Sequence, residues 1–259
     1  MRNYKTSFQR KFIIIRNTKL NYYVSPLLSR FQFIHAFFTK NSQEFSLELL
    51  TNALDLKNIN YSLNQIHSNN LILGSKLHPN VKSKADGIVS DQPCQSLWVY
   101  TADCLPILFA DKRTRRVAAI HCGRLGLEKK IIKRTISFFQ ELGSMRKELL
   151  VAVGPSISKI NYLLDNNYIE RFYKNISLNE SDQLIDNPYK DYNYISDLPK
   201  KKTLLPLDLR ENAFRQLSCE RIPSENIEIS EQCTYELYDE FHSWRRARTK
   251  KRQWSFICS

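Results

Sequence analysis

Residues 85–126 read ADGIVSDQPCQSLWVYTADCLPILFADKRTRRVAAIHCGRLG, and this stretch decides the predicted fold. Branched and aromatic side chains in it favour three β-strands, at residues 97–101, 105–110 and 116–121. The turn-like segment DKRTR joins the last two strands, which predicts an antiparallel hairpin. Cys104 lies in the polar corner before the second strand, and His121 ends the third. We therefore expect their side chains to reach one site.

A histidine upstream of this stretch completes a metal-binding pattern. His67, in the segment QIHS, joins Cys104 and His121 to give two imidazoles and one thiol. Three protein ligands with a fourth position left to water are typical of catalytic zinc, whereas structural zinc sites are usually closed by four. Side chains alternate along a strand, so His121 and Cys122 are predicted to point to opposite faces, and only one of them is available as a ligand.

The same residues also fit a different chemistry. Cys104 as a nucleophile with His121 as its base is the second interpretation, because a Cys-His pair supports amide cleavage without a metal. A third interpretation is purely structural, since a free cysteine is among the residue types most often buried for packing. Spacing alone leaves these alternatives open.

Outward from residues 85–126, strands and helices alternate along the chain. Further strands are predicted at residues 11–16, 31–39, 70–74, 149–153, 226–229 and 253–258, with a loop containing Pro26 between the first two. Helices are predicted at residues 46–56, 127–142, 165–173 and 208–219, with Ser46 and Asp208 as N-caps and Gly143 as a stop. Residues 176–202 are polar and without a sustained period, which indicates a surface excursion.

This order of elements predicts an α/β fold of the mixed α+β kind. Hairpins occur among the alternating elements, so mixed sheets covered by helices are favoured over a doubly wound parallel sheet. We expect a single domain over residues 31–259, preceded by an N-terminal strand and lead-in over residues 1–30. No glycine-rich phosphate loop of the common nucleotide-binding folds occurs in the sequence.

Composition narrows the class of protein. The 259 residues carry a net charge of +13, and 42% of them are hydrophobic, which is typical of a packed globule with a basic surface. The basic runs are not interleaved with regular aromatic residues, so we expect no specific nucleic-acid partner.

The six cysteines form no CxxC pair, which argues against a disulfide scaffold. Apolar runs are too short for a signal peptide or a membrane span, so we expect a cytoplasmic protein, monomeric or homodimeric, without membrane contact.

Several short motifs occur in an order that is specific to one family. They are QIHS, ADGIVSD, TADCLPILFAD, VAAIHCGRLGL, VGPSI, LPLDLRENAFRQL, CTY and SWRRARTKKRQ. In this order they closely resemble the YfiH/YlmD family, the laccase-domain or polyphenol-oxidase-like group described as purine nucleoside phosphorylases. The resemblance runs from about residue 31 to residue 257.

The resemblance implies a fold, a metal and an activity. It implies a single YfiH/CNF1-like α/β domain with mixed sheets, and zinc, with copper as the alternative metal, bound by His67, Cys104 and His121 as metal-binding and catalytic residues. The implied reaction is phosphorolysis of adenosine, inosine, guanosine or methylthioadenosine to the base and ribose 1-phosphate, with adenosine deamination as a further activity. Copper-dependent polyphenol oxidation and a role in keeping peptidoglycan precursors correct are also credited to the family.

The sequence departs from the family pattern at two places. Family members usually read HAGWRG where this chain reads His121-Cys122-Gly123-Arg124-Leu125-Gly126, so the tryptophan and the following arginine are absent in register. The early segment FFTR-GG is reduced to Phe37-Phe38-Thr39-Lys40 without its glycines. These departures affect the expected substrate and anion contacts rather than the metal ligands.

A phosphorylase also needs groups that hold phosphate, and planar guanidinium groups do this well. Arg245 and Arg246 in the segment SWRR are the predicted phosphate or substrate contacts, with Arg124 and Lys40 as further candidates. The alternative interpretation is that these basic residues are solvated surface residues without a binding role. Asp103 and Gln65, which neighbour the proposed ligands, are predicted to orient them.

Three hypotheses therefore stand at the sequence level. The first is a zinc-dependent purine nucleoside phosphorylase that takes a purine nucleoside and inorganic phosphate. The second is a Cys-His hydrolase or amidase acting on a peptidoglycan precursor, and a copper-dependent polyphenol oxidase is a variant on the same site. The third is a degenerate member that binds nucleosides without turnover, which the altered segment HCGRLG suggests.

Overall fold

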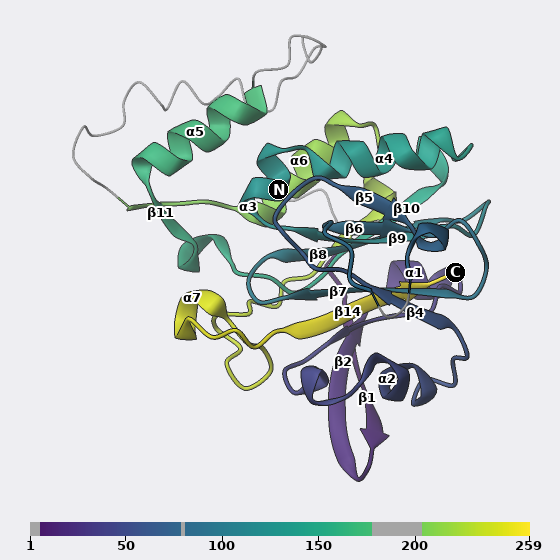
Figure 1. Cartoon of the computed structure of the whole chain (residues 1–259). Helices are drawn as coiled ribbons and strands as arrows, with labels where there is room; N and C mark the ends of the chain where they lie inside the picture. Colours follow the sequence, from purple (N-terminus) through teal and green to yellow (C-terminus); the bar gives the residue numbers. More distant parts are fainter. Residues whose placement is uncertain (1–5, 79–80, 178–203) are drawn as a thin grey trace.

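Two six-stranded sheets form the centre of the protein in the computed structural model, which describes residues 6–78, 81–177 and 204–259 (Figure 1). The first sheet has the spatial order β13 (Ile227–Ile229), β10 (Leu149–Val153), β8 (Leu105–Asp111), β9 (Val117–Cys122), β6 (Gly87–Val89) and β5 (Leu71–Leu73). The second has the order β1 (Gln9–Ile15), β2 (Thr18–Val24), β3 (His35–Phe38), β14 (Gln253–Cys258), β7 (Gln95–Thr101) and β4 (Ile59–Ser62). A small third sheet pairs β11 (Leu163–Asp165) with β12 (Leu204–Pro206).

Both large sheets mix parallel and antiparallel pairs, which confirms the predicted fold class. β8 and β9 form the expected antiparallel hairpin, with Leu105 opposite Cys122 and Ala110 opposite Val117. Parallel pairs join β5 to β6, β10 to β13 and β4 to β7. The register places Cys104, one residue before β8, beside the end of β9 that carries His121.

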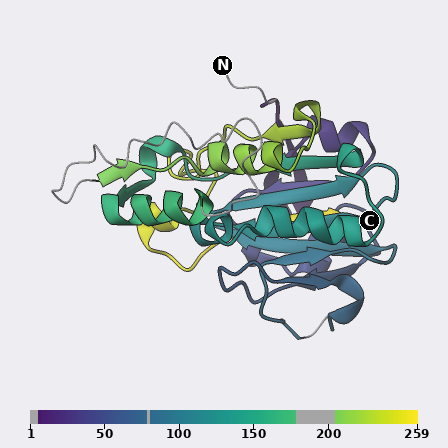
Figure 2. The same cartoon turned by 90° about the horizontal axis from the view of Figure 1, so that it is seen from above.

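The hydrophobic core lies in three layers. Between the sheets, Leu97 and Val99 of β7 share one cluster with Leu108 of β8 and Ala119 of β9. On the outer face of the first sheet, α4 (Ile131–Glu141) and α6 (Leu209–Cys219) lie side by side, as Figures 1 and 2 show. On the outer face of the second sheet, α2 (Leu47–Asn52) covers a cluster rich in aromatic rings. Successive side chains of a strand point to opposite faces of the sheet. A strand that is apolar throughout therefore contributes to the core on both of its faces.

Most predicted elements are confirmed, and so are the two predicted N-caps. The Ser46 side chain accepts a hydrogen bond from the Leu49 amide, and the Asp208 side chain accepts one from the Glu211 amide. The helix expected at residues 165–173 is α5 (Asn166–Ser177). The expected surface excursion at residues 176–202 lies almost wholly outside the described residues.

The prediction for the N-terminal region was wrong in detail. The segment between the two expected strands is no simple loop, because it holds β2 and the helix α1 (Pro26–Arg30). Pro26 begins that helix, where its missing N–H costs nothing, and the Ser25 side chain caps it. The strand expected at residues 31–39 is reduced to β3. β2 pairs with β3, so the segment before residue 31 belongs to the second sheet.

The single helix predicted at residues 127–142 was also wrong. The chain instead forms α3 (Arg124–Glu128) and α4, separated at Lys130, whose φ of 57° is left-handed and interrupts the helical hydrogen bonds. Two tertiary contacts stabilise the break, because Gln216 donates to the Leu127 carbonyl and Asn69 to the Lys129 carbonyl. The apolar spacing is the same for one helix or two, so periodicity alone does not reveal the break.

The short elements β4, β6, β11, β12 and α7 (Trp244–Ala247) were not predicted. Each has six residues or fewer, which is too short for a periodic pattern to stand out. Among the described residues, no helix is long and apolar enough to cross a membrane.

Candidate metal centre

His67, Cys104 and His121 converge at one end of the first sheet. His67 lies in the loop between β4 and β5, Cys104 lies just before β8, and His121 lies in β9. Their nitrogen and sulfur atoms all lie within 4.8 Å of one another, and the two imidazole rings meet edge to face at 4.7 Å. Two metal–ligand bonds of about 2.0–2.3 Å each span up to about 4.6 Å, so a shift of a few tenths of an ångström would let one ion contact all three. The three residues could therefore hold a metal ion.

The three side chains differ in burial, which leaves the cluster open on one side. His121 is buried, Cys104 is half-buried and His67 is exposed. Solvent therefore reaches the cluster from the His67 side. This arrangement suits a centre with one coordination position left for a small ligand, because structural sites are usually closed by a fourth side chain.

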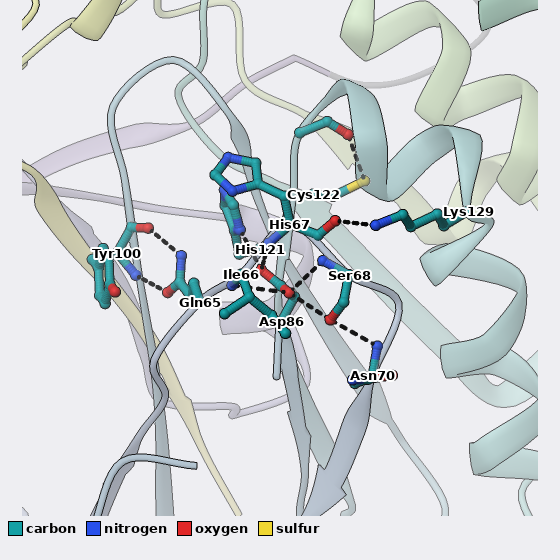
Figure 3. Close-up of polar contacts among 11 residues, drawn as sticks. Gln65, Ile66, His67, Ser68, Asn70, Asp86, Tyr100, His121, Cys122 and Lys129 are labelled. Carbon is teal, nitrogen blue, oxygen red and sulfur yellow. Dashed lines mark hydrogen bonds and ion pairs between the residues drawn. The ribbon is translucent and has the colours of Figure 1, made fainter. Parts of the chain in front are cut away.

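Asp86, which is fully buried, holds two of the three residues in place (Figure 3). One carboxylate oxygen accepts from the His121 Nδ1 at 2.8 Å and from the His67 amide at 3.0 Å. The other accepts from the Ser68 amide, the Ser68 hydroxyl and the Ile66 amide. Because Nδ1 of His121 is bound to Asp86, its Nε2 is the nitrogen that faces Cys104. A carboxylate behind a histidine is the usual support for a metal ligand.

The electrostatics of the cluster favour a thiolate at Cys104. Burial raises the pKa of the Cys104 thiol, but the charge and hydrogen bonds of His121 and His67 outweigh burial and lower it to about 6. Burial lowers the pKa of His121, but Cys104 and Asp86 raise it to about 9. For Asp86, burial opposes ionisation, yet the hydrogen bonds from His121 and Ser68 lower its pKa to about 2. Without a metal, these shifts favour a thiolate beside an imidazolium at neutral pH, and a metal bound here would replace the imidazolium proton.

The backbone of Gly123 lies close to the cluster. A Cβ atom on Gly123 would lie 2.7 Å from the Cys104 Sγ and 3.5 Å from the His67 ring. Its φ of −88° is ordinary, so the requirement is for space rather than for backbone freedom. The glycine that follows His121-Cys122 therefore keeps room for the thiolate.

The residues predicted to orient the ligands instead position the segments that carry them. Gln65 exchanges two hydrogen bonds with the backbone of Tyr100, at 2.8 and 2.9 Å, and so fastens the His67 loop to β7 (Figure 3). Asp103 accepts hydrogen bonds from the Thr234 hydroxyl at 2.7 Å and from the Arg245 amide at 2.6 Å. Neither side chain is bonded to a ligand histidine among the contacts of the described residues.

Two of the predicted phosphate contacts meet beside the cluster. Arg245 lies over the ring of Tyr162, with its Cζ 4.8 Å from the ring centroid, and donates to the Leu163 carbonyl. Arg124 forms a hydrogen bond with the Tyr162 side chain and an ion pair with Glu128. Burial raises the pKa of Tyr162 to about 12, and the charge of Cys104 contributes to the rise. Tyr162 therefore contacts both arginines and lies close enough to Cys104 for the thiolate charge to raise its pKa.

The other two residues predicted to contact phosphate, Arg246 and Lys40, donate side-chain hydrogen bonds to backbone carbonyls. Arg246 donates to the carbonyls of Thr234, Tyr235 and Phe241 at 2.6–2.7 Å. Lys40 donates from its side chain to the Tyr238 carbonyl at 3.1 Å. These bonds give both side chains a structural role in fixing the chain around residues 234–241.

Sequence reasoning missed two residues of the site. Asp86 lies in the motif ADGIVSD, and its position just before a short buried strand was the only local signal. Tyr162 lies in an irregular segment without any motif. The opposite orientation of His121 and Cys122 is confirmed, because Cys122 lies in the apolar core behind the first sheet.

Fold and site together define a mixed two-sheet α+β protein with a His-Cys-His centre at a sheet end. Sequence comparison leads to the family. The model of the family described as multi-copper polyphenol oxidoreductase laccase matches residues 40–259. The chain is 31% identical over 242 residues to the purine nucleoside phosphorylase slr1573 of Synechocystis, covering 87% of this chain and 89% of that one. It is 28% identical to the purine nucleoside phosphorylase YfiH of Shigella flexneri, covering 75% and 72%.

Solved structures agree with this result. The YfiH protein of Bacillus licheniformis matches with a TM-score of 0.73 and 22% identity, covering 92% of this chain and 96% of that one. YlmD of Geobacillus stearothermophilus matches with a TM-score of 0.73 and 20% identity, covering 96% and 99%. The chain belongs to the polyphenol oxidoreductase laccase family, the group of YfiH and YlmD.

Proposed function

We propose that this protein is a metal-dependent purine nucleoside phosphorylase, which converts a purine nucleoside and inorganic phosphate into the free base and ribose 1-phosphate. The observation that supports it most is the convergence of His67, Cys104 and His121 on one point, with Asp86 behind them. The curated relatives named purine nucleoside phosphorylase, at about 30% identity, support the reaction class. Adenosine, inosine, guanosine and methylthioadenosine are the proposed substrates.

Zinc is the proposed metal, with copper as the alternative, because two imidazoles and one thiolate form a donor set that zinc binds well. When bound, zinc supplies a Lewis acid that stabilises negative charge developing on a substrate oxygen. Cys104 is suited to bind it near neutral pH, since the pKa of its thiol is about 6. Asp86 fixes the tautomer of His121 and directs Nε2 toward the metal position.

The remaining polar groups are suited to hold phosphate and substrate. Arg124 and Arg245 both contact Tyr162. One guanidinium group can donate two parallel hydrogen bonds to two oxygens of a phosphate. The pKa of Tyr162 is raised to about 12 by burial, so its hydroxyl stays protonated and able to donate a hydrogen bond at neutral pH. We assign Arg124 and Arg245 to the phosphate and Tyr162 to a substrate oxygen, with Arg246 and Lys40 as supports of the loop around them.

The test is an assay with metal-replete protein, inosine or adenosine, and phosphate, in which ribose 1-phosphate and free base are measured. We expect both products from the native protein and none from Cys104→Ala. Cys94→Ser, which changes an exposed cysteine outside the cluster, is the matched control and should retain activity. Absence of base release from the metal-replete native protein would refute the proposal. Inosine formed from adenosine in the same assay would report the proposed deaminase activity.

A second candidate function rests on the thiolate at Cys104. The lowered pKa of this thiol and its contact with His121 are also the features of a nucleophile and its base, as in a Cys-His hydrolase. Metal analysis separates the two hypotheses. Metal that is lost in Cys104→Ala favours the phosphorylase, whereas metal-free protein that an alkylating reagent labels rapidly at Cys104 favours the hydrolase. Tight nucleoside binding without turnover in either assay would instead indicate a degenerate binding protein.

A further inference from the structure

A basic pocket lies at the opposite end of the β8–β9 hairpin from the metal centre. It has a volume of about 540 Å³ and is lined by the hairpin turn, the loop between β6 and β7, the end of α4 and Ser259. β8 has seven residues, so about 20 Å of extended chain separates the pocket from Cys104. The pocket is therefore distinct from the site described above.

Three arginines of the hairpin turn, Arg113, Arg115 and Arg116, line this pocket. They belong to the run KRTRR, which the proposed function does not use. Within the described part of the chain, none of the three forms an ion pair with a carboxylate. Guanidinium groups gathered in this way repel one another, and an anion placed between them removes that repulsion.

The hydrogen bonds of these arginines show which of them are able to bind a ligand. Arg115 donates to the carbonyls of Phe31 and Gln32 and stacks on the Phe33 ring at 3.7 Å, so its guanidinium is fixed by the protein. In the described residues, the Arg113 guanidinium has one hydrogen bond, to the Gly143 carbonyl at 2.6 Å. The Arg116 guanidinium likewise has one, to the Leu142 carbonyl at 2.7 Å. A guanidinium has five N–H groups, so Arg113 and Arg116 are oriented by the end of α4 and still have donors for a ligand.

Asp91 is the acidic side chain that lines the pocket, and within the described residues it forms no ion pair with these arginines. Asp91 accepts hydrogen bonds from the Ser75 amide and hydroxyl and from the Gln95 amide group. These contacts tie Asp91 to the neighbouring loop that carries Ser75. The pocket keeps an excess of positive charge, and the side chains of Pro93 and Leu142 add apolar wall.

We propose that this pocket binds the phosphate group of a small phosphate monoester, with Arg113 and Arg116 as the phosphate ligands and Arg115 as a fixed positive charge beside them. The planar fork of arginine matches two phosphate oxygens, which favours phosphate over a monovalent halide. The volume is that of a site for an organic molecule, since typical ligand pockets measure about 300–1,000 Å³. Pro93 and Leu142 would contact the organic part, so an ester should bind more tightly than inorganic phosphate.

The experiment measures binding of adenosine monophosphate and of inorganic phosphate by isothermal titration calorimetry, at a fixed ionic strength. Full-length Cys104→Ala protein is used, which removes one candidate metal ligand, and the Arg113 and Arg116 variants distinguish binding in this pocket from binding at Arg124 and Arg245. We expect saturable binding of the monophosphate, at least about tenfold tighter than that of inorganic phosphate, a difference of about 1.4 kcal/mol. Arg113→Gln and Arg116→Gln should each weaken it at least about tenfold, because each removes one charge-assisted contact. Arg113→Lys should restore part of the loss, since it restores the charge without the planar fork.

Arg134→Gln is the matched control, because Arg134 is an exposed arginine of the neighbouring helix α4 and does not line the pocket. Arg113 is exposed as well, so its replacement should leave the fold intact, which circular dichroism will check. The proposal is overturned if Cys104→Ala protein binds no monophosphate, or if Arg134→Gln weakens binding as much as Arg113→Gln does. Equal binding of chloride or sulfate would also overturn it, by showing general attraction to a basic surface. Equal affinity for inorganic phosphate would overturn the assignment of an organic ester.

Discussion

Two buried histidines, one in each large sheet, have opposite chemistry. His35 is the first residue of β3 and His121 is the penultimate residue of β9, and each is 4% exposed. Burial lowers the pKa of His35 to about 4, whereas Cys104 and Asp86 overcome burial and raise the pKa of His121 to about 9. The difference lies in their partners.

The partners of His35 are neutral backbone groups. Its Nδ1 contacts the Phe33 carbonyl at 2.8 Å, and its Nε2 accepts from the Ser25 amide at 2.7 Å. Both nitrogens are thereby used by a neutral ring, and none is left for a metal. His121 has a carboxylate on one nitrogen and a thiol on the other side. Burial by itself disfavours charge on a histidine, and the negatively charged partners of His121 reverse that effect.

Replacement of each histidine by alanine should separate the two roles most strongly. We expect His121→Ala to reduce bound metal from about one ion per chain to nearly none, since three protein ligands become two. His35→Ala should keep the metal and instead lose about 1–3 kcal/mol of stability, because the Ser25 amide is left without an acceptor. Elemental analysis and urea unfolding measure the two effects. Loss of metal from His35→Ala protein that remains folded would break the comparison.

Acid should destabilise the protein through His35. Between pH 6.5 and 4 the unfolded chain binds a proton at this histidine that the folded protein excludes, so stability falls as the pH is lowered. The stability at stake is about 3 kcal/mol, which is present in full above pH 6.5 and is lost as the pH falls to 4. The pKa of Asp86, about 2, places its own transition at lower pH. Urea unfolding at pH 7 and pH 4.5 should show a smaller difference for His35→Gln than for the native protein. Equal differences would contradict the prediction.

Asp86→Asn should weaken metal binding through His121, with the smallest effect of the three changes. The variant removes the negative charge behind His121 while nearly keeping the shape of the side chain. We expect metal affinity to fall by about 10–100-fold, as is usual when the partner of a ligating histidine is changed. Asp91→Asn is the control, because Asp91 also accepts several hydrogen bonds but lines the pocket at the other end of the hairpin. A competition titration with a metal-binding dye measures both, and equal losses would show a general stability effect.

Much of the architecture was predictable because it depends on local patterns. The β8–β9 hairpin, the strand β10 and the capped helices α2 and α6 follow from apolar spacing, turn residues and N-caps. The failures have tertiary causes. The break at Lys130 depends on contacts from Gln216 and Asn69. The short strands form because a neighbouring strand pairs with them, and their own sequence is too short to specify it.

The site shows the same division. The three candidate ligands were predicted as a set, because a thiol in a polar corner and histidines at strand and loop ends are chemically distinctive. The roles of their neighbours were not predictable, since adjacency in sequence pointed to Gln65 and Asp103, which position segments. The carboxylate that supports His121 comes from Asp86, 35 residues away in sequence.

The class of fold and the family follow from the sequence alone, which also predicts His67, Cys104 and His121 as candidate ligands. Strand and helix periods are local properties, and the ordered motifs carry the resemblance to the family. Only the tertiary structure decided that His121 is a charged partner of Cys104 while His35 stays neutral. It also decided that Arg124 and Arg245 meet at Tyr162, and that three arginines of the hairpin turn share a pocket. Charge and hydrogen bonding act through space, so they depend on which residues the packing of the two sheets brings together.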